Sequence, residues 1–233
     1  MSDVESSRVG SPTRHVSPTD AVGLAYQVVL RQLRDDYQAN LEQLQQKIRM
    51  RDAIISSALK MLKATDAPET TSRDSLVGYL AVIVLDPTFD PIENNLSASG
   101  ALQLITNQKL KRMLSNWTSE IVAVRELEQN WAKIAIGPLS NCLRELGIYR
   151  SLSDYFINDL EADWAIDESA RLEKQDIGPA RNPPSVTEIA ADSELEGLMS
   201  AAITYNATAN LESKALYKRI EEILSLLDQE IKE

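Results

Sequence analysis

An all-α fold is predicted from three features of this 233-residue sequence. Glycines (8) and aromatic residues (5%) are scarce, whereas residues that lose little side-chain freedom in a helix, such as Leu, Ala, Glu, Gln, Lys and Arg, are common. Apolar residues recur at spacings of three, four and seven over long stretches. Hydrophobic residues make up 43% of the chain, enough for a sizeable core. These features predict an antiparallel bundle of three long helices with short helices and one long irregular loop.

The first long helix is expected over residues 21–64, at the start of a single domain that spans 21–233. Residues 1–20, rich in Ser, Pro and charged side chains, are expected to be a disordered tail, native or left over from cloning. One apolar stripe follows the helix: Leu30, Leu33, Tyr37, Leu41, Leu44, Ile48, Ile55, Leu59 and Leu62. The opposite face is predicted to be solvated: Arg34, Asp35, Gln38, Glu42, Gln45, Arg49 and Asp52. Such a helix needs partner helices to bury its stripe.

A short, very apolar helix is predicted over residues 75–86. Its expected N-cap is Thr71 or Ser72, because a side-chain oxygen there can accept from the first free N–H groups. Pro87 should end it, since the residue before a proline is disfavoured in the helical conformation.

A corner is predicted between this segment and the second long helix. A short helix over 91–98, N-capped by Asp90, should end before a left-handed Gly100. Thr106 or Asn107 should then cap the second long helix. The free N–H groups at this helix start could alternatively hold an anion.

The second long helix is expected over residues 107–146, with Gly147 as its stop. Its stripe contains Leu110, Leu114, Trp117, Ile121, Val124, Trp131, Ala135, Cys142 and Leu146. Gly137-Pro138 should kink it, because proline removes one hydrogen bond of the helix. Trp117 and Trp131, two heptads apart, are interpreted as core aromatic residues, with a wall for ligand stacking as the alternative.

Residues 148–192 are expected to hold one short helix and a long loop, either mobile or functional. The last helix is predicted over 193–232 after a cap at Asp192 or Ser193. Its apolar seam contains three polar residues: Asn206, Asn210 and Ser213. They indicate either helix register with partial exposure or a polar pocket inside the bundle.

No catalytic residue, metal or cofactor is expected. The chain lacks the common phosphate-loop, dinucleotide, zinc and serine-hydrolase motifs, and its single histidine, His15, lies in the expected tail. Glu126 and Glu128 are placed on a charged face, and Cys142 is interpreted as a small core residue. The net charge of −11, without a basic stripe, argues against binding to nucleic acid.

Residues 97–117 resemble a family of uncharacterised bacterial proteins. Ser99-Gly100, Leu104-Ile105, Asn107, Leu110, Leu114 and Trp117 stand at the places of that family's Ser-Gly, Leu-Ile, Asn and Leu signature. Members begin with a single inner-membrane helix and continue as a helical extracytoplasmic domain. The long Leu-rich first helix and the amphipathic last helix are also similar.

This resemblance implies a periplasmic domain held at the bacterial inner membrane, without an established activity. The chain departs from the family because no apolar run of 18 or more residues precedes the first long helix. Either the span has been removed or the chain is a soluble relative.

The resulting expectation is a non-enzymatic helical sensor, binding or interaction domain of a membrane-associated protein. Candidate binding residues are Ser99, Gly100, Thr106, Asn107, Trp117 and Trp131. The alternatives are a self-associating structural protein and a hydrolase with an unrecognised site in 148–192. The domain is expected to bind a protein partner or to self-associate. Contact with the membrane is expected through a segment outside this chain.

Overall fold

The fold is all-α, as predicted. The computed structural model describes residues 18–93, 100–160 and 173–232, and these residues contain helices but no strand. The long helices are α1 (Pro18–Asp66), α3 (Gln108–Ile134) and α7 (Ser193–Lys232). Short helices are η1 (Pro68–Thr70), α2 (Arg73–Ile83), η2 (Ala101–Gln103), α4 (Ser140–Glu145), α5 (Tyr149–Asn158) and α6 (Val186–Ala190). The tail expected over 1–20 lies largely outside the described residues, and α1 already begins at Pro18.

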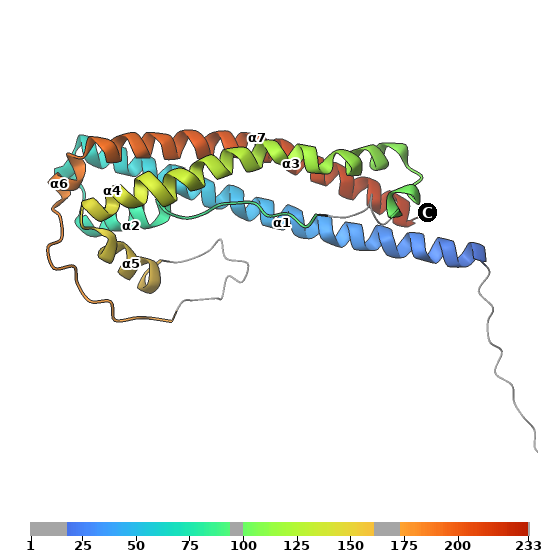
Figure 1. Ribbon diagram of the computed structural model, residues 1–233, viewed down its shortest axis with the longest axis horizontal. Coiled ribbons are helices and arrows are strands. Elements are labelled where there is room, and N and C mark those ends of the chain that lie inside the picture. Colours follow the sequence, from blue (N-terminus) through green and yellow to red (C-terminus); the bar gives the residue numbers. More distant parts are fainter. Residues whose placement is uncertain (1–17, 94–99, 161–172, 233) are drawn as a thin grey trace, which may run out of the picture.

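Helix α7 packs along both α1 and α3, and α2 packs on the second half of α1 (Figure 1). In Figure 1, α1 runs the whole length of the molecule, and α2, α5 and α6 gather at the end where α1 finishes. The predicted solvated face of α1 is confirmed, because all seven residues named for it are exposed. The bundle end formed by α2, α5 and α6 is called the α2 end below.

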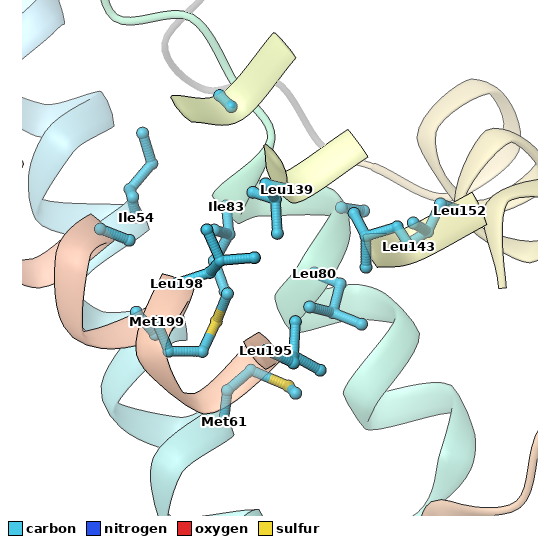
Figure 2. Close-up of a cluster of buried hydrophobic side chains, with 14 of the residues drawn as sticks. Ile54, Met61, Leu80, Ile83, Leu139, Leu143, Leu152, Leu195, Leu198 and Met199 are labelled. Carbon is cyan, nitrogen blue, oxygen red and sulfur yellow. The ribbon is translucent and has the colours of Figure 1, made fainter. Parts of the chain in front are cut away.

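The core consists of two apolar clusters. The α2-end cluster joins side chains from α1, α2, the α3–α4 region, α5, α6 and the start of α7, and Figure 2 shows its centre. The second cluster joins the first half of α1, α3 and the last turns of α7. Trp117 belongs to the second cluster, where its ring meets that of Tyr37 edge-on at 4.9 Å, and Trp131 belongs to the α2-end cluster. Burial of each large apolar side chain contributes about 1.5–3 kcal/mol.

The second long helix is interrupted at Gly137-Pro138, as predicted, by a π-helical turn, η3 (Ala135–Leu139). Pro138 has no N–H to donate, and the wider turn accommodates the missing hydrogen bond. The Ser140 hydroxyl donates to the carbonyl of Ala135 at 2.8 Å, which helps to satisfy the widened turn. Helix α4 then ends at Glu145, and Gly147 follows with a φ of +70°, which confirms the predicted stop.

The helix predicted over 75–86 ends earlier, at Ile83, and the helix predicted to start at Pro91 is wrong for its described part, 91–93. Residues 85–93 instead form an extended segment, called the strap below. Its buried residues alternate with outward-facing ones: Leu85, Pro87, Phe89 and Pro91 point inward. Residues 94–98 of the predicted helix lie outside the described residues.

The strap lies between α1 and α3, whose side chains bond its backbone. The N–H of Ile92 donates to Asn40 Oδ1 at 2.7 Å, and Asn40 Nδ2 donates back to the carbonyl of Ile92 at 3.2 Å. The N–H of Asp90 donates to Gln43 Oε1 at 3.1 Å. These bonds replace the strand partner that an extended segment normally needs, because backbone groups removed from water must be paired.

Gly100 adopts the predicted left-handed conformation, with φ of +73°. Gly100→Val is expected to lower the free energy of unfolding by about 1–3 kcal/mol, because the strain comes from the backbone alone. A Cβ at Gly100 would meet nothing within 4 Å. Denaturant titration measures the change, and Gly197→Ala is the control: Gly197 lies in α7 with open space around it, so alanine should stabilise there by up to about 1 kcal/mol. An unchanged Gly100→Val protein would contradict the assignment.

Candidate functional site

A buried polar layer separates the two apolar clusters. Arg51 of α1 is 0% exposed and its Nη2 donates to Oε1 of Glu128 on α3, which is 3% exposed. The Nη1 of Arg51 donates to Ser213 Oγ at 2.8 Å and to Asn210 Oδ1 at 3.2 Å, both on α7. The layer therefore ties all three long helices together.

The layer also holds the strap. Arg51 Nη2 donates to the carbonyl of Pro87 at 3.2 Å, and the N–H of Phe89 donates to Glu128 Oε2 at 3.1 Å. The buried ion pair therefore satisfies the Pro87 carbonyl and the Phe89 N–H of the strap, which lies outside the helices. The Nε of Arg51 is buried without a partner among the described residues, which leaves one N–H of the layer unpaired.

Placing Glu128 on a charged face is wrong, and the physical reason is its position in the helix repeat. One row of buried positions in α3 has steps of three or four residues and continues to Ala135 at the start of η3: Leu110, Leu114, Trp117, Ile121, Val124, Glu128, Trp131 and Ala135. The apolar stripe read from the sequence jumps seven residues from Val124 to Trp131, and Glu128 stands in that gap. Glu126 is exposed, as expected.

The same repeat reveals Arg51, which sequence reasoning missed. The seam of α1 alternates steps of three and four: Leu30, Leu33, Tyr37, Asn40, Leu44, Lys47, Arg51, Ile54, Ala58 and Met61. Ile55, Leu59 and Leu62 of the predicted stripe lie beside this seam, and Leu59 is 46% exposed. A strict heptad register, kept through polar residues, was the available signal.

An open cavity lies at the α2 end of the molecule. It has a volume of about 400 Å³ and is bounded by the first turns of α2, by α5 and by the segment 178–183. Its lining is Arg73, Asp74, Val77, Ser151, Asp154, Tyr155, Asp159, Gly178, Pro179, Ala180 and Pro183. Apart from the three residues of α2, the described lining comes from the region 148–192, for which a functional loop was one of the two expectations.

Specific hydrogen bonds hold the segment around residues 178–183, which is called the wall of the cavity below. Gln175 and Asn158 bond each other twice: Asn158 Nδ2 donates to the Gln175 carbonyl at 2.9 Å, and the Gln175 N–H donates to Asn158 Oδ1 at 3.0 Å. Arg73 donates from Nη2 to Ser151 Oγ at 2.7 Å and from Nε to the carbonyl of Pro184 at 3.3 Å. The wall is therefore attached to both α2 and α5.

Gly178 is required where the wall turns. Its φ is +68°, and a Cβ there would lie 3.0 Å from Nη2 of Arg150. Arg150 in turn donates from Nε to the Ile177 carbonyl at 3.0 Å. A side chain at residue 178 would disturb this contact, so glycine permits the close approach of wall and α5.

The candidate residues from the sequence are not brought together at this cavity. Ser99 lies outside the described residues. Thr106 lies at the opposite end of the bundle, where its hydroxyl is 3.4 Å from Glu230 Oε2, and Tyr26 donates to the same carboxylate at 2.7 Å. Asn107 Oδ1 accepts from the N–H groups of residues 109 and 110, so it is the predicted cap of α3. Trp117 and Trp131 are buried in the core, and a binding role for these residues stays a prediction.

Cys142 is buried, as expected, and should resist thiol reagents. Burial and the nearby Asp192 carboxylate raise the pKa of its thiol to about 12, so almost no thiolate forms at pH 8. A colorimetric disulfide reagent at pH 8 should react with the folded protein at least about 100-fold more slowly than with the urea-unfolded protein. Equal rates would contradict the burial.

Among the described residues, no group of three or more His, Cys, Asp or Glu side chains is placed to hold a metal ion. No helix in the described ranges is long and apolar enough to cross a membrane. The fold and the cavity define an all-α protein with a preformed, charged depression at one end of its helices. Comparisons with protein-family models, curated proteins and solved structures found no match to this chain.

Proposed function

We propose that this chain is a non-enzymatic helical sensor or binding domain of a bacterial membrane-associated protein, and that the cavity at the α2 end holds its ligand. The observation that carries the proposal is the position of the cavity. It lies at the end where α1 finishes, and α1 runs from there along the whole molecule to the opposite end (Figure 1). In the family that the sequence resembles, a membrane span precedes the first long helix, so α1 would connect the ligand end to the membrane.

A physical route leads from the cavity into the bundle. Arg73 and Asp74 in the first turn of α2 line the cavity, and α2 leads directly into the strap. The strap is held by Arg51 and Glu128, which also join α1 to α3. A ligand that shifted α2 would act on this layer, and the three long helices, working as one antiparallel bundle, would carry the shift along α1.

Binding is favoured over hydrolysis by the state of the cavity's carboxylates. Asp74 and Asp159 are exposed and Asp154 is half-buried. A hydrolase would need a buried, perturbed carboxylate in the cleft. The buried carboxylate Glu128 lies instead in the core, paired with Arg51.

The test is a ligand screen with a matched pair of variants. Ala180 lines the cavity and is half-buried, so Ala180→Trp should fill the space without removing a hydrogen bond. Ala39 is exposed on α1, away from the cavity, so Ala39→Trp adds the same side chain elsewhere. We expect thermal-shift and calorimetric screens to find a ligand that binds the unmodified chain and Ala39→Trp but not Ala180→Trp. A screen without ligands, together with pull-downs without a partner, would count against the proposal.

Self-association is the second candidate, favoured by two exposed apolar side chains near the start of α1. Leu24 is 61% exposed and Val28, one turn later, is 66% exposed. A second copy could cover both. Light scattering on the purified chain decides this point, since a monomer at high concentration would exclude it.

A further inference from the structure

We infer that the cavity at the α2 end selects a small organic cation that carries a primary ammonium group on an aliphatic chain. This inference rests on the proposed function, because it names the ligand class of the same cavity. The features that carry it are the shape of the cavity, the unequal charges on its walls and the apolar surface between them.

The charges of the cavity favour a cation. The described residues of its lining include three carboxylates, Asp74, Asp154 and Asp159, and one guanidinium, Arg73. Among the described residues, none of these four groups forms an ion pair with another side chain, so the described lining carries more negative than positive charge. A ligand that enters it replaces water beside these carboxylates, and an ammonium group gains where a carboxylate would be repelled.

The one cationic side chain among the described lining residues, Arg73, already donates hydrogen bonds to protein groups beside the cavity. Arg73 uses Nη2 for Ser151 and Nε for the carbonyl of Pro184. By contrast, the side chains of Asp74 and Asp159 make no hydrogen bond or ion pair within the described ranges, and the Asp154 carboxylate accepts only from Asn158 Nδ2 there, at 2.8 Å. The acceptor capacity left in the cavity is therefore anionic.

The rest of the lining favours an alkyl chain over a bare ion. Val77, the Tyr155 ring, Pro179 and Pro183 contribute apolar surface between the carboxylates. A chain of methylene groups can pack on these surfaces, and the face of Tyr155 can accept a cation. Among the described residues, these carboxylates do not form a group of three that could hold a metal ion.

The cavity is also preformed, which lowers the entropic cost of binding. The two hydrogen bonds between Asn158 and Gln175, together with the close approach at Gly178, hold the wall in place without a ligand. A volume of about 400 Å³ accommodates an amino acid or a short diamine, with room for bridging water.

Isothermal titration calorimetry on the full chain tests the inference with four probes: lysine, 1,5-diaminopentane, succinate and CaCl₂. We expect lysine, 1,5-diaminopentane or both to bind, and succinate and Ca²⁺ not to bind. The two amines separate the sources of the ammonium group, because 1,5-diaminopentane lacks only the carboxylate of lysine. Stronger binding of lysine would indicate an amino acid, and stronger binding of the diamine would indicate a polyamine.

Two pairs of variants locate the binding. Asp74→Asn/Asp159→Asn removes two charges from the cavity and should weaken binding of the amine at least tenfold. The variant should keep the fold, because neither side chain has a partner among the described residues. The control, Asp66→Asn/Glu69→Gln, removes two exposed charges from the last residue of α1 and from η1, outside the cavity. Circular dichroism verifies that both remain folded.

The outcomes are distinct. Weaker amine binding in Asp74→Asn/Asp159→Asn but not in the control variant supports the inference. Equally weakened binding in both variants would show non-specific attraction between charges and overturn the inference. Binding of succinate or of a neutral compound, lost in Ala180→Trp, would overturn the choice of a cation and leave the proposed function intact. Failure of every probe and of the wider screen would overturn both.

Discussion

Glu128→Ala should lower the free energy of unfolding by about 3–5 kcal/mol, because it leaves Arg51 buried without its carboxylate partner. Arg51 is 0% exposed. Burial lowers its pKa to about 10, so the guanidinium is still charged at neutral pH. The same substitution takes the acceptor from the N–H of Phe89, a second buried group that would then be unpaired.

Urea denaturation at pH 7 measures this effect, and Glu126→Ala is the matched control. Glu126 is exposed two residues away on the same helix, so its loss should change stability by less than about 0.5 kcal/mol. The double variant Arg51→Met/Glu128→Leu should recover most of the loss, because an apolar pair of similar size carries no buried charge. It should fall short of full recovery, since the strap loses its bonds at Pro87 and Phe89. Equal stability of Glu128→Ala and Glu126→Ala would show that the ion pair does not form.

The long helices and α2 could be predicted because their local signals agree. Caps at Ser72 and Asn107 and a stop at Gly147 lie where side-chain chemistry places them. The sequence predicts Asp192 or Ser193 as the N-cap of α7. Asp192 is the N-cap, because its Oδ1 accepts from the N–H of Leu195 at 2.8 Å. These features depend on residues a few positions apart, which the sequence displays directly.

The polar seam of α7 shows where local signals stop. Asn206, Asn210 and Ser213 were recognised as unusual, with helix register or a polar pocket as the two interpretations. All three are buried, which favours the second in a modified form: Asn210 and Ser213 bond Arg51, and the space is filled by its guanidinium. The partner comes from α1, more than 150 residues away, and sequence spacing within one helix cannot reveal it.

The cavity depends even more on distant pairing. Its wall has no repeat of apolar residues, so the sequence predicted only a loop there. Ser185 and Glu188 form a capping box that starts α6, a short-range signal that was overlooked among the surrounding prolines. The contacts of Arg73 with Ser151 and Pro184 join segments that the sequence gives no reason to bring together.

Phe89→Ala should be the second most damaging substitution, with a loss of about 3–5 kcal/mol in the free energy of unfolding. Phe89 is 1% exposed and belongs to the second apolar cluster, although it comes from the strap and not from a helix. Its removal leaves a cavity between α1 and α3, where the strap fills the space.

Hydrogen exchange distinguishes loss of the strap from general destabilisation. In Phe89→Ala, the amides of Asp90 and Ile92, which donate to Gln43 and Asn40, should lose more protection than the amides in the middle of α7. Ile92→Ala is the control within the strap, because Ile92 is 45% exposed and its truncation should cost less than about 1 kcal/mol. Uniform loss of protection across the chain would mean that strap and bundle unfold together. Loss of protection in the strap amides alone would mean that the strap opens while the helices stay folded. The strap must be able to move in this way if it is to connect the cavity to the Arg51–Glu128 layer.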